Sequence, residues 1–378
     1  MTGPEEVVVV GAGVIGTSCA WSLARDGLTV TLVDPEPFRG ASYVAAGMLA
    51  PISELTAGHE RLAELGLASL ARWPAFAANV TADGGVDPEL RSLSTVTVAL
   101  TRADLAMVDE HHARQGTHGS AVTRLRSREL REHEPLLAPG VVGGSVTTGE
   151  AAVDTRKVGA GLTGAAGACG VRTVADAVAR LDRDADGQVR GVTTAGGDVV
   201  RADAVVVAAG HRTTAVLAGQ GHAAPEVRPV KGQILRLRGP AGALGHQVRA
   251  IVHGRQVYVV PRADGRLVVG ATVEERGEDR SVTAGAVREL LDDASAVLPF
   301  LDECELIEAT AGLRPATVDD RPVIGPAGSG LVIATGHHRG GVLLAPLTAD
   351  LVVAAVRTGR AVPGFEDVAP DLEAAPWS

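Results

Sequence analysis

The stretch VVVVGAGVIG, residues 7–16, constrains the fold of this chain more than any other part of the sequence. Four valines in a row are typical of a parallel strand that is buried on both faces. Of the glycines that follow, Gly11 suits a tight turn, Gly13 lets the backbone approach a pyrophosphate, and Gly16 allows close helix–strand packing. A helix that begins here also presents free N–H groups to phosphate. The stretch therefore predicts a Rossmann-like dinucleotide-binding unit.

An acidic residue lies where such a unit binds ribose. Asp34 ends the predicted second strand, LTVTLVD, 18 residues after Gly16. A carboxylate at this position accepts hydrogen bonds from the hydroxyls of an adenosine ribose. Because it favours an unphosphorylated ribose, the pattern indicates NAD or FAD rather than NADP.

The next loop, FRGASYVAAGMLAP (38–51), favours FAD over NAD. A small, glycine- and alanine-rich loop has no obvious task in an NAD enzyme, whereas in a flavoprotein it runs beneath the extended cofactor. We expect Ser42 near the pyrophosphate, and Ala46, Gly47 and Met48 near the flavin ring. An NAD-dependent dehydrogenase stays open as the weakest alternative.

The order of predicted elements indicates an α/β protein with two domains. Residues 226–275 are rich in strands, whereas the chain after residue 320 returns to strand–helix signals. We therefore predict a Rossmann-like cofactor domain with a β-sheet-rich substrate domain inserted in discontinuous segments. The cofactor domain takes residues 1–85, 140–225 and 305–378, and the substrate domain takes 86–139 and 226–304.

Charge and composition exclude several other classes of function. A net charge of −10, from 35 basic and 45 acidic residues, argues against a nucleic-acid partner. We expect no membrane-spanning segment and no secretory signal, because no stretch approaches about 20 apolar residues and no basic residue precedes Arg25. Cys19, Cys169 and Cys304 are far apart, so they predict neither a disulfide framework nor a zinc site, and a cytoplasmic location is expected.

Six blocks of sequence carry a family resemblance. In chain order they are GAGVIG, GASYVAAGMLAP, PVKGQILRL, VYVVPRADGRLVVGAT, AGLRPATVDDRPVIG and ATGHHRGGVLLAP. Over nearly its whole length the chain resembles the D-amino-acid oxidase superfamily of FAD-dependent enzymes, and most closely the bacterial glycine oxidases of thiamine biosynthesis. The resemblance implies a two-domain α+β flavoprotein.

The resemblance also implies substrate-binding residues. Arg314, in AGLRP, matches the arginine that holds the substrate carboxylate, a task that suits its planar fork of donors. Tyr258 matches a tyrosine of the substrate pocket, Arg339 matches a second pocket arginine, and Met48 lies in the loop beneath the flavin. Without the resemblance, either arginine would be interpreted as half of a surface ion pair, and Tyr258 as a packing residue.

The predicted cofactor site combines the glycine-rich turn with residues that the resemblance implies. Its members are Gly11, Gly13, Val14, Ile15, Gly16, Asp34, Pro35, Ala41, Ser42, Ala46, Gly47, Met48, Val178, Gly210, His337, His338, Arg339, Gly340, Gly341, Val342 and Leu343. Some relatives attach the flavin to a cysteine just after the AGLRP block, where this chain has Ala316 and Thr317. Non-covalent FAD is therefore expected.

The implied reaction is oxidation of the Cα–N bond of a small amino acid, glycine above all. Hydride passes from the neutral amine to the flavin, dioxygen reoxidises the flavin to give hydrogen peroxide, and the imine yields glyoxylate and ammonia or feeds thiazole assembly. A functional link to thiazole synthase and assembly into a homo-oligomer are compatible with the resemblance. The alternatives are a D-amino-acid or sarcosine oxidase, a flavin-dependent dehydrogenase that reduces a membrane quinone, and a catalytically silent flavin-binding protein.

Histidines give weaker signals. His337 and His338 are adjacent, so their side chains diverge and are not expected to bind one metal ion together. We expect backbone contacts from them and a helix that begins at Gly340 or Gly341. His111, His112 and His133 lie in polar helical stretches and are expected to be solvated.

Three departures from the family pattern fall on the expected pocket wall and leave the preferred substrate open. They are Gln256, residues 309–311 (ATA) and Gly340. No metal site is predicted: DRDADG (182–187) begins like a calcium loop, but Thr193 stands at its twelfth position and a turn is expected instead.

Overall fold

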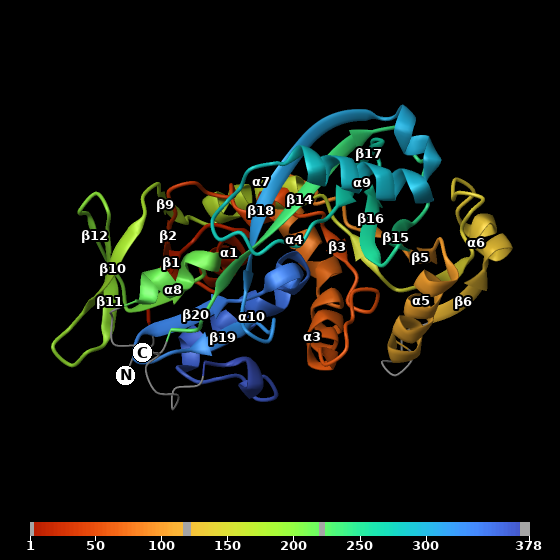
Figure 1. Cartoon of the computed structure of the whole chain (residues 1–378). Helices are drawn as coiled ribbons and strands as arrows, with labels where there is room; N and C mark the ends of the chain where they lie inside the picture. The colour runs from red at the N-terminus through yellow and green to blue at the C-terminus, as the bar shows by residue number, and fades with distance from the viewer. Residues whose placement is uncertain (1–3, 116–121, 219–223, 371–378) are drawn as a thin grey trace.

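The computed structural model describes residues 4–115, 122–218 and 224–370. The chain opens with the predicted unit: β1 (Glu6–Val10), α1 (Val14–Arg25) and β2 (Thr29–Val33), with β1 and β2 parallel. These strands belong to a six-stranded sheet of order β19-β20-β13-β1-β2-β9 (Figure 1). The other members are β9 (Arg172–Val174), β13 (Ala204–Val207), β19 (Val323–Pro326) and β20 (Leu331–Thr335). Segments far apart in the sequence thus form one sheet, as expected of a discontinuous domain.

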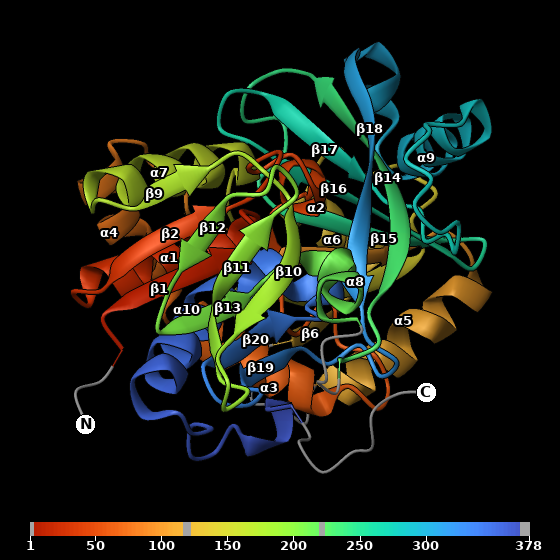
Figure 2. The same ribbon diagram turned by 90° about the vertical axis from the view of Figure 1, so that its left-hand side faces the viewer.

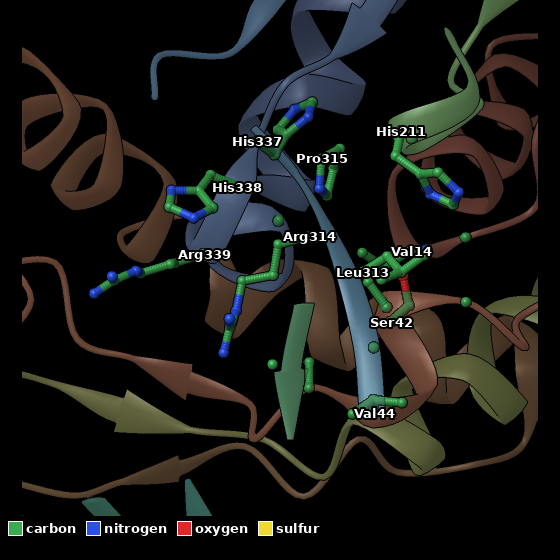
Figure 3. Close-up of a pocket in the computed structure, with 18 of the residues that line it drawn as sticks. Val14, Ser42, Val44, His211, Leu313, Arg314, Pro315, His337, His338 and Arg339 are labelled. Carbon is green, nitrogen blue, oxygen red and sulfur yellow. The ribbon is translucent and has the colours of Figure 1, made fainter. Parts of the chain in front are cut away.

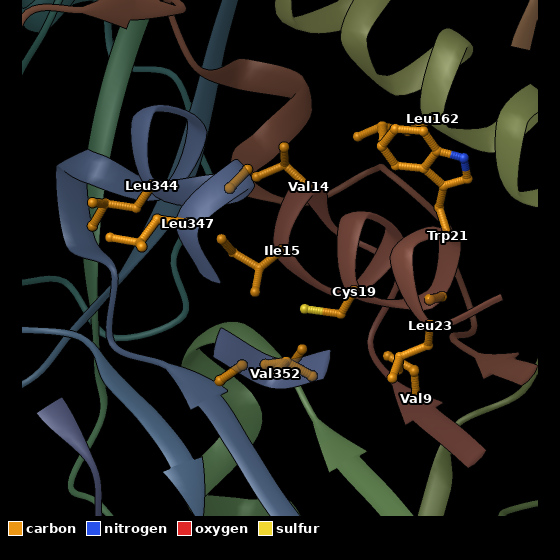
Figure 4. Packing of buried hydrophobic residues seen from close by; sticks show 14 of the residues in the cluster. Val9, Val14, Ile15, Cys19, Trp21, Leu23, Leu162, Leu344, Leu347 and Val352 are labelled. Atoms are coloured by element: carbon orange, nitrogen blue, oxygen red, sulfur yellow. The ribbon is translucent and has the colours of Figure 1, made fainter. Parts of the chain in front are cut away.

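Both faces of this sheet are covered. On one face α1 packs against α7 (Thr155–Ala168) and α10 (Gly341–Thr358), with Val9, Trp21 and Val352 in the shared core (Figure 4). The other face carries a small antiparallel sheet of β10 (Val178–Arg183), β11 (Val189–Thr194) and β12 (Val199–Arg201) (Figure 2). Covering both faces explains why β1 and β13 are runs of valine and alanine rather than alternating strands.

A second sheet has eight strands in the order β18-β14-β17-β16-β15-β5-β7-β6. Their bounds are β5 (Thr95–Ala99), β6 (Val122–Arg126), β7 (Gly143–Thr147), β14 (Arg228–Arg238), β15 (Gln247–Val252), β16 (Arg255–Pro261), β17 (Arg266–Gly270) and β18 (Glu305–Ala316). Helix α9 (Ala284–Val297) packs on one face through Leu290. The far end of β18 joins the two sheets, because Ala316 forms an isolated bridge with His337.

The remaining elements include a small sheet of order β3-β8-β4. They are α2 (Ala41–Val44), β3 (Met48–Leu49), α3 (Glu60–Leu70), α4 (Trp73–Gly84), β4 (Arg91–Ser92), α5 (Arg102–Gln115), α6 (Ser127–His133), β8 (Ala151–Ala152), α8 (Thr213–Leu217) and the short 3-10 turns η2 (Gly210–Arg212), η3 (Pro299–Glu303), η4 (His338–Gly340) and η5 (Glu366–Val368). Strands β7 and β18 lie in the eight-stranded sheet although their ranges fall in the predicted cofactor domain. The domain boundaries at 140 and 305 therefore stay a prediction.

The statement from the sequence that no stretch approaches about 20 apolar residues is wrong. His338–Thr358 is long and apolar enough to cross a membrane, with a mean hydropathy of 1.6, and it is the one such helix among the described residues. However, 67% of this apolar stretch is buried inside the protein. Its length and hydropathy are those of a core helix, which packs on α1 and α3.

Candidate active site

A cavity of about 1010 Å³ extends from the carboxyl end of β1 to the strands of the eight-stranded sheet (Figure 3). Its lining includes Gly11 and Asp34 at one end and Tyr258 and Arg314 at the other. A cavity at the carboxyl ends of parallel strands is the usual position of a nucleotide in an open α/β sheet. Most of the predicted cofactor and substrate residues therefore line one continuous cavity.

Two positions of the glycine-rich turn, 11 and 16, have no room for a side chain. Gly11 has a φ of +99°, and a Cβ there would lie 2.4 Å from the carbonyl oxygen of Ala208. A Cβ on Gly16 would lie 1.8 Å from the carbonyl oxygen of Gly11. Any side chain at these positions would push α1 away from β1, so the turn keeps the start of α1 open to a phosphate group.

Asp34 and Ser42 tie this turn to its neighbours. The carboxylate of Asp34 accepts the backbone N–H of Ala12 at 2.6 Å and that of Glu36 at 2.7 Å. The backbone N–H of Val14, in the first turn of α1, donates to Oγ of Ser42 at 2.9 Å. Carboxylate oxygens have further lone pairs, so Asp34 can also accept from ribose hydroxyls.

The loop after α2 presents its amides to the cavity. Ala46 and Gly47 line the cavity, and their N–H groups have no partner within the described ranges of the chain. The carbonyl oxygens of this loop are all engaged elsewhere: that of Ala45 accepts from Oγ1 of Thr155 at 2.9 Å, and that of Gly47 accepts from the N–H of Val153 at 2.9 Å. Two free donors on a cavity wall fit the oxygen and nitrogen acceptors of a flavin ring.

Two buried arginines hold the same loop from the eight-stranded sheet. The guanidinium of Arg236, on β14, donates to the carbonyl oxygens of Tyr43 at 3.2 Å and Val44 at 3.1 Å. That of Arg262, just after β16, donates to the carbonyl oxygen of Ala46. Burial lowers the pKa of both arginines to about 10, so they stay charged at neutral pH. The sequence gives no signal for this role, because the contacts join residues about 200 positions apart.

The structure places most predicted cofactor residues on the cavity wall. Those that line it are Gly11, Gly13, Val14, Ile15, Asp34, Pro35, Ala41, Ser42, Ala46, Gly47, Met48, Val178, Gly210, His337, His338, Arg339, Gly341 and Val342. Gly16 instead packs against the turn, and Gly340 and Leu343 line a smaller adjoining cavity of about 100 Å³.

At the substrate end, Arg314 and Tyr258 reach toward each other across two glycines. A Cβ on Gly232 of β14 would lie 2.3 Å from Nη2 of Arg314, which is on the neighbouring strand β18. A Cβ on Gly270 of β17 would lie 2.3 Å from the hydroxyl oxygen of Tyr258, on β16. Because β14 and β17 lie between β18 and β16, the two glycines form the floor on which both side chains rest.

The electrostatics of this end favour an anionic ligand. Burial lowers the pKa of Arg314, and its hydrogen-bond acceptors are neutral: the carbonyl oxygens of Thr272 at 3.1 Å and Lys231 at 3.5 Å, and the hydroxyl of Tyr258. No carboxylate lies within ion-pair distance of Arg314 or Arg339 in the part of the chain that the structure describes. Burial also raises the pKa of Tyr258, so its hydroxyl stays a donor at neutral pH. A desolvated cation without a counterion is costly, and a bound carboxylate would remove that cost.

The two histidines point in different directions, as predicted (Figure 3). Nε2 of His337 lies 2.9 Å from Oγ1 of Thr348 inside α10, and burial lowers the pKa of His337 to about 3. Nδ1 of His338 lies 3.1 Å from Oδ1 of Asp320, and burial lowers its pKa as well. Both imidazoles are neutral at neutral pH.

Several polar residues of the cavity wall were not foreseen from the sequence, and two of them form an ion pair. Glu54 and Arg249 both line the cavity, and they pair at 3.1 Å beside Tyr258. Glu54 follows the predicted flavin loop by a few residues, and that proximity is a signal that could have found it. Arg249 lies in an ordinary alternating strand, where a charged residue usually indicates a solvated face.

The glycine-rich turn, the flavin-sized cavity and the unpaired arginine at its end define the class of protein. The sequence from residue 6 to 355 matches the family model described as FAD dependent oxidoreductase, and the chain belongs to this family. FAD is accordingly its cofactor, and the predicted two-domain α/β fold is confirmed.

Three relatives narrow the class further. The chain is 33% identical to the glycine oxidase of Geobacillus kaustophilus over 93% of both chains. The crystal structure of glycine oxidase from that organism matches with a TM-score of 0.89 at 31% identity, and the match covers 97% of this chain and 98% of that one. It is 32% identical to the bifunctional protein ThiO/ThiG of Synechocystis, over 93% of this chain and 51% of the relative. The structure of iminodiacetate oxidase from Chelativorans sp. BNC1 matches at 27% identity with a TM-score of 0.85, over 96% of this chain and 98% of that one. The predicted enzyme class, an FAD-dependent amino-acid oxidase, is confirmed, and the reaction is FAD-dependent oxidation of an amine.

Proposed function

We propose that this enzyme oxidises the Cα–N bond of glycine or another small amino acid, with dioxygen as the electron acceptor. The observation that carries the proposal is the position of Arg314. Its guanidinium has no carboxylate partner among the described residues and lies beside the neutral hydroxyl of Tyr258, in the cavity that begins at the glycine-rich turn. The 33% identity to a glycine oxidase supports glycine as the first substrate to test.

The residues of this chain have simple tasks in the proposed reaction. Arg314 binds the substrate carboxylate through two parallel N–H donors, and Tyr258 donates a further hydrogen bond to it. Holding the carboxylate fixes the direction of the Cα–H bond and of the amine lone pair, so the contribution of these residues is orientation. Bound FAD supplies the two-electron oxidising power, and dioxygen restores it as hydrogen peroxide forms. The imine product takes up water to give an oxo acid and ammonia.

Several finer features belong to the same proposal. FAD is held without a covalent bond, since none of Cys19, Cys169 and Cys304 lines the cavity. The three free thiols support a cytoplasmic location. The ThiO/ThiG relative supports a functional link to thiazole synthase, in which the imine feeds thiazole assembly. The proposed partners are thus a small amino acid and dioxygen, with neither nucleic acid nor membrane, and a homo-oligomer is compatible with them.

The test is a peroxide assay on the purified yellow protein. Glycine added without oxygen should bleach the flavin absorbance, and in air it should consume oxygen and release hydrogen peroxide. Turnover of sarcosine or D-alanine without turnover of glycine would change the proposed substrate but keep the enzyme in the same superfamily. Bleaching by glycine with no peroxide in a membrane-free assay would instead indicate a dehydrogenase.

A further inference from the structure

An ion pair forms part of the cavity wall beside the proposed substrate site. Nη1 of Arg249, on β15, lies 3.1 Å from Oε1 of Glu54, and the two side chains are 13% and 24% exposed. Arg249 is paired directly with Tyr258 of β16, so the two side chains share one face of the sheet. The pair therefore lies next to the hydroxyl that is proposed to bind the substrate carboxylate.

The backbone before Glu54 is fixed by a buried carboxylate. Glu150 is 2% exposed and accepts hydrogen bonds from the N–H of Ile52 at 3.2 Å, the N–H of Ser53 at 2.8 Å and Oγ of Ser53 at 2.7 Å. These bonds satisfy both backbone donors that precede Glu54 and the nearest side-chain hydroxyl. The hydrogen bonds from Ile52 and Ser53 to Glu150 thus hold the backbone next to Glu54 in place.

The carbonyl oxygens of the same two residues are engaged as well. Nε2 of Gln115 donates to the carbonyl oxygen of Ile52 at 2.9 Å, and Nε2 of His111 lies 3.0 Å from that of Ser53. The expectation that His111 is solvated is therefore wrong, and its burial lowers its pKa to about 4. A glutamate on a backbone held at both donors and acceptors loses little further freedom when it forms a contact, so Glu54 is preorganised.

Positive side chains outnumber negative ones around Tyr258. Three arginines, Arg249, Arg314 and Arg339, face one carboxylate, that of Glu54, which also lines the adjoining small cavity with Arg339. Within the described ranges only Arg249 has an ion-pair partner among the three. The α-carboxylate of a substrate can be matched by Arg314, but a second substrate carboxylate at this wall would meet an arginine already engaged and a fixed negative charge.

We propose that Glu54 is a charge filter: it occupies Arg249 and thereby excludes amines that carry a second carboxylate. This inference rests on the proposed function and names the substrate class of that site, namely amino acids whose only anionic group is the α-carboxylate. If Glu54 loses its charge, Arg249 becomes available, and the same wall then binds a second carboxylate. Like charges placed together at a binding site are a common way to reject wrong partners.

The first experiment measures binding and needs no turnover. Acetate and malonate are titrated into the holoenzyme, and their dissociation constants are obtained from the change in flavin absorbance. The normal enzyme should bind acetate in preference to malonate. Glu54→Gln, which keeps the shape and removes the charge, should improve malonate binding relative to acetate by about tenfold or more. The double variant Glu54→Gln/Arg249→Met should lose this gain.

A matched control removes a charge elsewhere. Glu64 lies on α3 near Glu54 in the sequence and pairs with Arg61 at the surface, 3.0 Å apart. Glu64→Gln should keep the acetate-to-malonate ratio of the normal enzyme. Preference of the normal enzyme for malonate, or an unchanged ratio in Glu54→Gln, would overturn the proposal, and a gain that survives in the double variant would contradict the role of Arg249.

A kinetic experiment completes the test. The ratio of kcat/KM for iminodiacetate to kcat/KM for glycine should rise in Glu54→Gln by about the same factor as the binding ratio. If neither glycine nor another small amino acid is oxidised, the proposed function fails while the binding titration still decides on the filter. If glycine is oxidised and neither ratio changes, the filter fails and the proposed function stands.

Discussion

At the scale of single residues, the site depends on a cation that the protein itself does not neutralise. Arg314 lies in the wall of the cavity and donates to backbone carbonyls and to the hydroxyl of Tyr258, whereas many surface arginines of the chain have a carboxylate partner. Two glycines make room for it and for Tyr258. An unneutralised cation in a cavity wall favours an anionic ligand, which agrees with the proposed role of Arg314.

Replacing Arg314 by methionine should lower kcat/KM for glycine by at least about 100-fold, since it removes a charge-assisted bidentate contact. The visible spectrum of bound FAD should stay, because Arg314 has no part in the packing of the glycine-rich turn. Steady-state kinetics with a spectrum of each preparation check both statements. Activity within about threefold of normal would refute the role of Arg314 as the carboxylate ligand.

Gly232→Ala should act through Arg314. The added Cβ would lie 2.3 Å from Nη2 of Arg314, and the far end of a long side chain moves more easily than a strand. We expect KM for glycine to rise about tenfold or more, with the thermal midpoint of the holoenzyme little changed. Gly167→Ala is the control, since a Cβ there meets nothing within 4 Å and should leave KM as it is. A normal KM in Gly232→Ala would show that Arg314 does not need its present position.

At the scale of elements, the loop between α2 and β3 is held by hydrogen bonds from both parts of the molecule. Its side chains are small, so its shape comes from its backbone. Arg262 donates to the carbonyl oxygen of Ala46, Thr155 of α7 donates to that of Ala45, and Arg236 of the eight-stranded sheet donates to the carbonyl oxygens at the end of α2. The eight-stranded sheet thereby helps to shape the proposed cofactor site.

Arg262→Met should weaken FAD binding by about tenfold or more, because it leaves the carbonyl oxygen of Ala46 buried without a donor and releases the loop. Titration of apoprotein with FAD, followed by flavin fluorescence, measures the dissociation constant. Arg262→Lys should recover part of the affinity. Arg124→Met, which removes an exposed arginine paired with Asp109, serves as the control and should bind FAD normally. Equal affinity in Arg262→Met and the control would be evidence against this role.

At the scale of the whole molecule, α10 joins the site to the core of the first sheet. It begins at Gly341 on the cavity wall and continues through the core to Thr358. His337 precedes this helix and is only 2% exposed, and its neutral imidazole forms a hydrogen bond with the side chain of Thr348 in α10. A histidine buried in its neutral form links the stability of the fold to pH.

Acidification should destabilise the fold, and His337 should contribute to that effect. Its pKa is about 3 in the folded protein against 6.5 for the free side chain, so between these values the unfolded chain binds more protons. Stability then falls as pH decreases from about 6.5 toward 3, by up to about 1.4 kcal/mol per pH unit for this residue. Denaturation midpoints at pH 7.5 and 5 should differ less in His337→Gln than in the normal protein. An identical difference in both would exclude His337 as a source.

Local sequence was sufficient for the parts of the site that local geometry controls. Gly11 and Gly16 are required by contacts within one strand–turn–helix unit, and the same unit predicts its helix and its two parallel strands. Arg314 and Tyr258 are indicated only by resemblance, because nothing in the surrounding residues distinguishes them from a surface arginine and a packing tyrosine. Arg314 and Tyr258 share one cavity because the strand order of the eight-stranded sheet brings β18 and β16 close together.

The sequence by itself thus determined the α/β class, the dinucleotide turn and, through its resemblance, the use of FAD. Only the tertiary structure decided which charges meet. Glu54 and Arg249 are 195 positions apart, and Arg262 is 216 positions from the carbonyl oxygen that it holds. The physical reason is that periodicity reports which face of an element is buried, whereas the partner of a buried charge depends on how distant strands are ordered and paired.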